Sequence, residues 1–311
     1  MKVIDFSSAR ILVVGDIMLD RYWVGDVERI SPEAPVPIVR VGEQSDRLGG
    51  AANVARNIVS LGGQASLMGV VGADEAGRQL RQMLNEGGIE DRLLEDPAIQ
   101  TTLKLRVMGR QQQLIRLDFE AQPTHEVLRN KQEEFRRALE WADLVVMSDY
   151  GKGGLTHIRD LIALAREMGR PILVDPKGDE YERYSGATLL TPNRGEFFQV
   201  VGRTKTEDDL RARAHALRER LGLDHLLVTR SEEGMTLFSA GQRFFHVPAQ
   251  AREVFDVSGA GDTVIAALAV ALACHEPIDD AVRLANKAGG IVVGKLGTAT
   301  VSHAELFERD E

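Results

Sequence analysis

The sequence predicts an α/β fold in which helices cover both faces of a mostly parallel sheet. Short apolar runs alternate with amphipathic stretches along the chain. The runs are apolar at successive positions, as expected for strands that are buried on both faces. Strands are predicted at 11–14, 66–71, 144–147, 172–174, 188–190 and 226–228, and helices at 53–61, 76–84, 128–141, 158–168, 208–221, 261–273 and 281–293.

Polar residues follow several predicted strands directly. These pairs are Gly15-Asp16, Ser148-Asp149, Asp175-Pro176 and Thr191-Pro192. Ligands of open parallel sheets bind beyond the carboxyl ends of the strands. We therefore expect these residues to converge on one rim of the sheet.

Two segments interrupt the alternation of strands and helices. Residues 20–41 contain three prolines, and residues 101–120 read as a β-hairpin with its turn near Gly109-Arg110. Prolines are tolerated in edge strands. We expect the two segments to form a small antiparallel β-lid inserted in a single domain, which spans residues 1–311.

Composition restricts the class of partner. The chain has 311 residues and a formal net charge of -9, which argues against nucleic acids and anionic membranes as partners. Its one cysteine, Cys274, excludes an internal disulfide and fits a reducing compartment. The apolar run at 11–14 is too short for a signal peptide or a membrane span. We expect a cytoplasmic protein that binds small molecules.

The most informative stretch is D-V-S-G-A-G-D-T, residues 256–263, at the start of a predicted helix. Helix N-termini present unpaired N–H groups and the positive end of the peptide dipole. Gly259, Ala260 and Gly261 are small enough for an anion to approach those groups. Asp262 then either accepts a proton from an attacking hydroxyl or caps the helix, and these four residues alone leave both open.

Several motifs together resemble the ribokinase-like (PfkB) carbohydrate kinases. L-G-G-A-A-N-V-A-R-N-I-V-S-L-G (residues 48–62) is similar to their N-terminal signature, and residues 256–263 to their C-terminal one. G-D-I-M-L-D, D-P-K, T-P-N-R-G-E and T-R-S-E-E-G also match in order, so that the resemblance covers nearly the whole chain. It implies a three-layer ribokinase-like fold, a phosphoryl transfer from ATP with Mg²⁺, K⁺ in some members, and a lid that often forms a homodimer.

Three further runs resemble one branch of this family. They are G-D-I-M-L-D-R-Y-W, R-I-S-P-E-A-P-V-P-I-V and Q-Q-L-I-R-L-D-F-E. That branch phosphorylates the anomeric C1 hydroxyl of a heptose 7-phosphate, on the pathway to ADP-heptose and the lipopolysaccharide core. Some of its members carry a nucleotidyl-transferring domain with an H-x-G-H motif, which this sequence lacks. We therefore expect a stand-alone kinase. The alternatives are another sugar or nucleoside kinase of this fold and a non-catalytic sensor, which would not need Asp262.

The resemblance implies roles on the sugar side of the site. Asp262 is the expected base, Asp20 the main sugar-binding carboxylate and Asp16 a second one. For Asp16, a turn carboxylate that accepts backbone N–H groups is an equal alternative. Gly49, Gly50 and Asn53 are expected to contact the sugar. The G-G-A-A-N spacing is one residue shorter than in some members, so Asn53 could instead belong to a helix start packed on the sheet.

Other residues match the nucleotide side of the family's site. Asn193 and Glu196 are expected to hold Mg²⁺ through water, with a helix-capping pair as the alternative. Thr229, Arg230, Gly234, Lys177 and Asn286 match positions around the nucleotide, although packing or surface roles explain them as well.

Two smaller sets of residues complete the expected site. Asp256, with the backbone near Gly297, matches a monovalent-cation site in some members or simply caps its turn. In the lid, Lys104, Arg106 and Arg116 are candidates for the substrate's phosphate, because guanidinium groups pair well with phosphate. The alternative is a solvated basic edge that discourages strand pairing.

Overall fold

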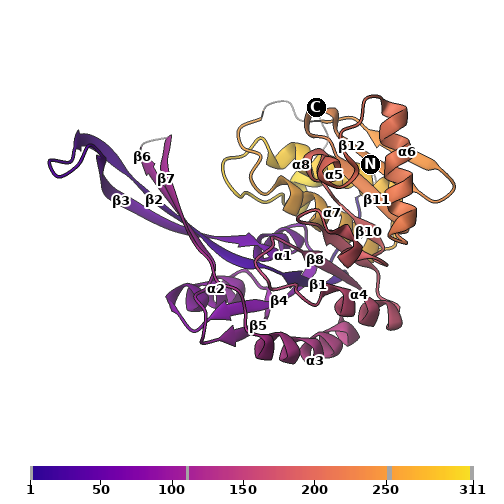
Figure 1. The fold of residues 1–311 in the computed structure, drawn as a ribbon, viewed down its shortest axis with the longest axis horizontal. Helices are drawn as coiled ribbons and strands as arrows, with labels where there is room; N and C mark the ends of the chain where they lie inside the picture. The colour runs from indigo at the N-terminus through magenta and orange to yellow at the C-terminus, as the bar shows by residue number, and fades with distance from the viewer. Residues whose placement is uncertain (1–2, 110–111, 251–253, 309–311) are drawn as a thin grey trace.

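The computed structural model describes residues 3–109, 112–250 and 254–308, and within these ranges the chain forms a nine-stranded and a four-stranded sheet (Figure 1). The strand order of the larger sheet is β13-β12-β11-β10-β9-β8-β1-β4-β5. From β11 to β5 every pair of neighbours is parallel, whereas β12 is antiparallel to both of its neighbours. The strands are β1 (Arg10–Gly15), β4 (Gln64–Gly72), β5 (Glu90–Asp96), β8 (Leu144–Ser148), β9 (Ile172–Asp175), β10 (Leu189–Leu190), β11 (His225–Thr229), β12 (Met235–Ser239) and β13 (Arg243–Val247).

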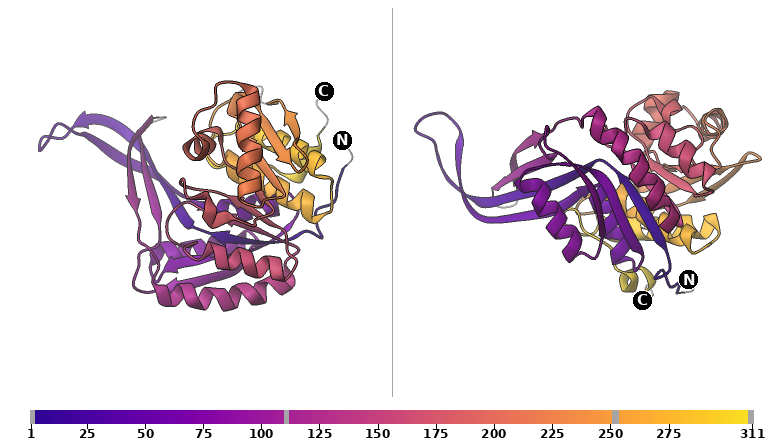
Figure 2. Two further views of the ribbon diagram at one scale, coloured as in Figure 1. Left: turned by 45° about the vertical axis from the view of Figure 1, so that its right-hand side comes forward. Right: turned by 90° about the horizontal axis from the view of Figure 1, so that it is seen from below.

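Helices cover both faces of this sheet and enclose two separate apolar cores (Figure 1, Figure 2). The interior strand β1 supplies both cores alternately: Ile11 and Val13 belong to one, Leu12 and Val14 to the other. The first core lies beneath α1 (Ala51–Ser60), α2 (Glu75–Glu86), α7 (Ala260–Ala273), α8 (Ile278–Val292) and α9 (His303–Phe307). The second lies beneath α3 (His125–Trp141), α4 (Ile158–Glu167), α5 (Arg194–Val201) and α6 (Glu207–Arg220).

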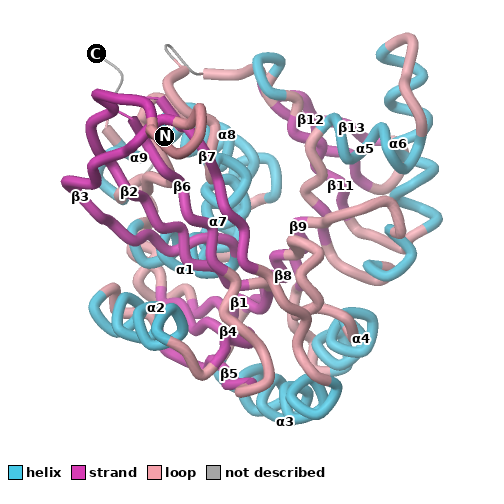
Figure 3. Tube along the Cα trace, turned by 60° about the vertical axis from the view of Figure 1, so that its left-hand side comes forward, coloured by secondary structure: helices cyan, strands magenta, loops and turns pink. Residues whose placement is uncertain are grey.

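The smaller sheet forms the lid, and it projects from the body beside the N-terminus of α1 (Figure 1, Figure 3). Its strand order is β3-β2-β6-β7, with β2 (Ile17–Ile30), β3 (Pro37–Gly50), β6 (Leu103–Gly109) and β7 (Gln112–Phe119). Two antiparallel hairpins meet through a parallel pairing of β2 with β6. The β2–β3 hairpin is longer than the predicted segment 20–41, since it begins at Ile17 and ends at Gly50.

The predicted α/β/α fold with a β-lid is confirmed, and each predicted strand and helix overlaps an observed one. The strands β5, β12 and β13 and the short helix α9 were not predicted. Arg110, in the predicted turn near Gly109-Arg110, lies outside the described residues. Within the described ranges, none of the helices combines the length and the apolar character needed to span a membrane.

Candidate active site

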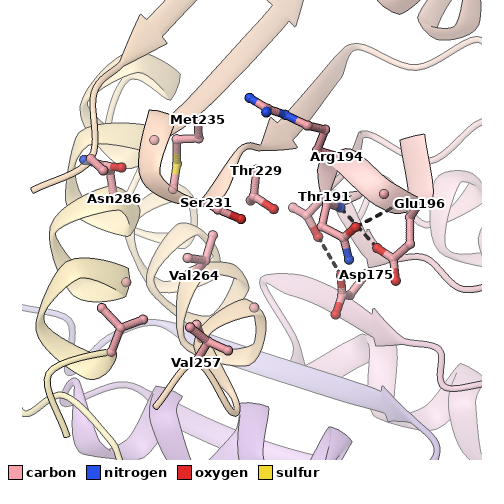
Figure 4. A pocket seen from close by; sticks show the side chains of 18 of the residues that line it. Asp175, Thr191, Arg194, Glu196, Thr229, Ser231, Met235, Val257, Val264 and Asn286 are labelled. Carbon is pink, nitrogen blue, oxygen red and sulfur yellow. Dashed lines mark hydrogen bonds between the residues drawn. The ribbon is translucent and has the colours of Figure 1, made fainter. Parts of the chain in front are cut away.

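The expected rim forms where four neighbouring parallel strands end. β1, β8, β9 and β10 lie side by side and end at Gly15, Ser148, Asp175 and Leu190. A cavity of about 630 Å³ opens beside this rim, between the ends of β8, β9, β10 and β11 and the helices α7 and α8 (Figure 4). The site therefore lies where the strand pattern predicted it.

Asp262 is a buried carboxylate in the first turn of α7, and two side chains hold it. Its Oδ2 accepts a hydrogen bond from Asn53 Nδ2 at 2.7 Å, and its Oδ1 accepts one from the Tyr150 hydroxyl at 2.8 Å. Asn53 lies on α1, and a second bond joins α1 to α7, in which Thr263 Oγ1 donates to Asn57 Oδ1 at 2.9 Å. The start of α7 is thus fixed to α1 by buried polar contacts, and the carboxylate has one orientation.

Burial raises the pKa of Asp262 to about 6, although the bonds from Asn53 and Tyr150 oppose the shift. The negative charge of Asp20 raises this pKa further. A carboxylate with a pKa near 6 is ionised at neutral pH and is a better proton acceptor than an ordinary aspartate. Its carboxylate accepts from two side chains and, among the described residues, from no backbone N–H of the helix start, so its environment suits a general base better than a helix cap.

Tyr150 was not predicted as a site residue, and Asp16 explains its position. Asp16 accepts hydrogen bonds from the backbone N–H groups of Tyr150, Lys152 and Gly154, each at 2.9 Å. This is the turn-carboxylate alternative that the sequence left open for Asp16. The loop after β8 is thereby fixed so that the Tyr150 hydroxyl meets Asp262. A Tyr two residues after a buried strand end, in S-D-Y-G-K-G, was the signal available in the sequence.

We expect Tyr150→Phe to move the pH dependence of turnover toward higher pH. The hydroxyl lowers the pKa of Asp262 by bonding to its ionised form, so its removal raises that pKa above about 6. Activity requires the ionised base, and the acid limb of kcat/KM should therefore lie at higher pH in the variant. A pH–rate series from pH 5 to 9 measures this. An unchanged acid limb would show that Asp262 does not govern it.

The loop before α7 has the geometry expected of an anion site. Gly259 caps the helix with a φ of 76°, a left-handed conformation that favours glycine. The N–H of Ala260 is bonded to Val257 O, whereas the N–H groups of Gly259, Gly261 and Asp262 have no acceptor in the described part of the chain. Of the three predicted donors, Gly259 and Gly261 are therefore free and Ala260 is not, and Asp262 adds a further free donor.

The cavity itself is suited to a nucleotide. Its wall includes apolar side chains from several elements, among them Met235, Val257 and Val264 (Figure 4). Six residues predicted for the nucleotide side also line it, namely Lys177, Asn193, Glu196, Thr229, Gly234 and Asn286. Gly289 and Gly290 of α8 line the same wall and were not predicted. A pocket that is apolar at one end and polar at the other fits a base and a polyphosphate.

The polar end of the cavity brings the carboxyl groups of Asp175 and Glu196 close to each other. Burial, reinforced by the charges of Asp262 and Glu196, raises the pKa of Asp175 well above its usual range. Glu196 Oε1 accepts from Lys177 Nζ at 3.1 Å. Neighbouring carboxylates of this kind are suited to a bound divalent cation. No group of three or more metal-ligating side chains occurs among the described residues, so such a cation would be held largely by water and phosphate.

Asn193 and Glu196 also form the capping box that was the alternative reading. Asn193 Oδ1 accepts from Glu196 N at 3.0 Å, and Glu196 Oε2 accepts from Asn193 N at 3.1 Å. The box fixes both side chains at the start of α5, where both residues line the cavity. Capping and a water-mediated cation contact are compatible, since each carboxylate or amide oxygen has two lone pairs.

The structure does not bring Arg230 and Asp256 to the cavity. The guanidinium of Arg230 is bound by Glu207 and Glu233, so its charge is neutralised inside the fold. The oxygens of Asp256 accept backbone N–H groups from Ser258 and Gly297, which is the turn-capping alternative. Both side chains have structural partners that account for their burial and charge.

The lid places a charged face beside Asp262. Arg106 Nη1 donates to Asp20 Oδ1 at 2.6 Å, and Arg116 binds Asp118 at 2.8 Å on the neighbouring strand. Lys104 is adjacent to Asp20 across the β2–β6 pairing, and burial lowers its pKa. Gly49 leaves room for Asp20, because a Cβ there would lie 2.6 Å from Asp20 Oδ2. Gly50 ends the lid at the start of α1.

Comparison with solved structures identifies the fold. Phosphofructokinase-2 from Escherichia coli in complex with potassium superposes with a TM-score of 0.79 at 22% identity, over 96% of both chains. Ribokinase from Arabidopsis thaliana, complexed with ribose and ATP, gives a TM-score of 0.76 at 19% identity, over 96% of this chain and 97% of that one. Identities this low show a shared fold, here the ribokinase-like one.

Sequence comparison shows closer relatives. A D-beta-D-heptose 7-phosphate kinase of Bordetella bronchiseptica is 59% identical over 300 residues, which are 96% of each chain. A bifunctional protein HldE of Methylococcus capsulatus is 54% identical over 302 residues, and the chain spans 64% of that relative's length. The family model of the pfkB carbohydrate kinases matches residues 8–305. The chain therefore belongs to the PfkB family of carbohydrate kinases.

Proposed function

We propose that this protein transfers the γ-phosphoryl group of ATP to the anomeric C1 hydroxyl of D-glycero-β-D-manno-heptose 7-phosphate, which yields the 1,7-bisphosphate. The observation that carries the proposal is the buried Asp262, held by Asn53 and Tyr150 beside the free N–H groups of the anion loop. The 59% identity to a heptose 7-phosphate kinase supports the choice of substrate. The reaction belongs to the route to ADP-heptose and the lipopolysaccharide core.

The proposed mechanism follows from the placement of these groups. Asp262 accepts the proton of the C1 hydroxyl, and the resulting oxygen attacks the γ-phosphorus in line as the bond from that phosphorus to the β,γ-bridging oxygen breaks and ADP leaves. The N–H groups of Gly261 and Asp262 stabilise the charge that spreads over the transferred group. ATP lies in the 630 Å³ cavity, with its base toward Asn286 and its phosphates toward Thr229 and Lys177.

The polar end of the cavity fits Mg²⁺, which Asn193 and Glu196 would hold through water. When bound, the cation neutralises charge on the β- and γ-phosphates. Each oxygen of Asp256 accepts one backbone N–H group, so the turn-capping role accounts for this side chain without a monovalent cation. We derive no step from K⁺.

We further propose that the chain works as one kinase domain, with a lid that closes over the sugar and pairs two subunits. Asp20 and Lys104, on the charged face of the lid, then bind sugar hydroxyls, and Arg106 orients Asp20. The opposite face of β7 carries Ile115, Leu117 and Phe119, each at least 41% exposed. An apolar sheet face of this kind supports a homodimer formed through the lid.

A substrate panel tests the proposed reaction. With ATP and Mg²⁺, we expect turnover of heptose 7-phosphate and a new anomeric phosphate signal in ³¹P NMR. Ribose, fructose and nucleosides should react with a kcat/KM lower by roughly 10²-fold or more, because they leave the phosphate site unfilled. Turnover restricted to an unphosphorylated sugar would refute the choice of substrate.

A further inference from the structure

Two arginines at the base of the lid have no acidic partner. Arg47 lies on β3 and Arg56 on α1, and both are half-buried. Within the described ranges, neither guanidinium forms an ion pair with a carboxylate. Arg47 lies over the ring of Tyr22, with 4.8 Å between its Cζ and the ring centroid. Arg56 Nη1 donates to Thr298 O at 3.4 Å. Partly buried positive charge without a counterion is costly unless an anion joins it.

The two guanidinium groups meet at the same short segment. Arg47 packs so closely on Gly297 that a methyl group at that position would overlap its Nη1. Arg56 bonds to the next residue, Thr298. Burial, together with the nearby charge of Arg47, lowers the pKa of Arg56. Two like charges are therefore held at one short segment with no ion-pair partner among the described residues, and a shared phosphate would compensate both.

This segment lies next to the proposed base. A Cβ at Gly259 would lie 3.6 Å from Thr298 Cγ2 and 3.7 Å from Asp262 Oδ2. Arg56 also follows Asn53, which bonds to Asp262, by three residues on the same helix. None of the residues of this segment or the two arginines lines the nucleotide cavity. An anion held here would belong to the acceptor and not to ATP.

Arg106 and Arg116, two of the three sequence-based candidates for this role, are less suited to it. Arg106 is neutralised by Asp20 and Arg116 by Asp118. Their charges are already compensated within the lid, so a phosphate would have to displace a carboxylate at 2.6 or 2.8 Å. Arg47 and Arg56 need no such exchange.

We propose that Arg47 and Arg56 together bind the phosphate group of the sugar substrate and so select phosphorylated sugars. The proposal rests on the proposed function, which it deepens by naming the specificity residues. It replaces the sequence-based candidates Lys104, Arg106 and Arg116 as the phosphate ligands, and it leaves Lys104 to the sugar hydroxyls.

Two substrates and matched variants test this assignment. Arg47→Gln and Arg56→Gln should each lower kcat/KM for heptose 7-phosphate by roughly 10²-fold, mainly through KM, because each removes a charge-assisted contact to the phosphate. For the unphosphorylated heptose, kcat/KM should stay within about 3-fold of the wild type, since that sugar has no phosphate to lose. Arg56→Lys keeps the positive charge but loses the planar guanidinium that can bind two phosphate oxygens. Its kcat/KM for heptose 7-phosphate should therefore lie between those of the wild type and of Arg56→Gln. Arg40→Gln, an exposed change of the same charge on β3, is the control.

Binding of inorganic phosphate to the free protein, measured by titration calorimetry, gives a second readout that needs no turnover. Both Gln variants should weaken it. If the wild type fails to phosphorylate heptose 7-phosphate but the variants still weaken phosphate binding, the proposed function fails and the anion site stands. Equal losses for both sugars, a change confined to the KM for ATP, or unaltered phosphate binding would each overturn the assignment.

Discussion

Asp262→Asn is expected to lower kcat by roughly 10²–10⁴-fold while the protein remains folded. The amide has the shape of the carboxylate and can still accept from Asn53 Nδ2, so the contact between α7 and α1 survives. What the variant loses is the ability to take a proton from the acceptor hydroxyl. Steady-state turnover with saturating ATP measures the loss. Asp208→Asn, at a side chain that is 92% exposed on α6, is the matched control and should keep full activity.

Asp262→Asn is expected to lower activity but not stability at neutral pH. The pKa of Asp262 is raised to about 6 in the folded protein, so the group favours folding at pH below its ordinary value of 3.8. This contribution is lost as the pH rises through about 6, where the buried carboxylate must ionise. At pH 7.5 the neutral Asn variant should therefore have a Tm at least as high as the wild type. The difference should shrink as the pH falls from 6 toward 4. A variant that is inactive and also clearly less stable at pH 7.5 would contradict the proposed role.

Gly259→Ala is expected to lower kcat by about 10²-fold or more. The added Cβ would lie 2.8 Å from Asn53 Nδ2 and would displace the amide that orients Asp262. Small displacements of catalytic groups cost rate in this range. The φ of 76° adds backbone strain of roughly 1–2 kcal/mol. Steady-state kinetics measure the loss of kcat, and urea unfolding measures the loss of stability, so the two methods separate crowding at Asn53 from backbone strain.

Gly222→Ala provides the control for strain. Gly222 has a φ of 63° and nothing within 4 Å of an added Cβ, so the variant bears the backbone strain without the crowding. It should lose similar stability and keep its turnover. Should Gly259→Ala match this control in both measurements, the contact between Asn53 and the loop would have no catalytic importance.

Periodic features of the fold were predictable from the sequence because they depend on local patterns. Apolar runs and amphipathic helices gave the three layers and the rim. The lower part of the lid was missed, because residues 42–50 are polar and glycine-rich and become strand only by pairing with β2. The β12–β13 pair was missed because short antiparallel strands at a sheet edge do not follow the alternation of strand and helix.

Site residues could be predicted where they belong to one short motif. They could not be predicted where their hydrogen-bond partners lie far away in the sequence. The anion loop and Asp262 lie within eight residues and were found. Tyr150 lies 112 residues from Asp262, and Asn53 lies 209 residues away, so their bonds to it leave no local pattern. Arg47 and Arg56 were likewise not singled out, because only the fold shows that they lack carboxylate partners and converge on Gly297 and Thr298.

Both long strands of the lid grow directly out of the supports of the proposed base. A single residue, Asp16, separates β1 from β2, and it anchors the loop that carries Tyr150. β3 runs without a break into α1, which carries Asn53, and Ala51 N donates to Asp16 O at 3.0 Å. The lid is therefore joined to both supports of the proposed base by single peptide units. A rotation of the lid relative to the body would act on the Tyr150 loop through Asp16 and on Asn53 through the start of α1.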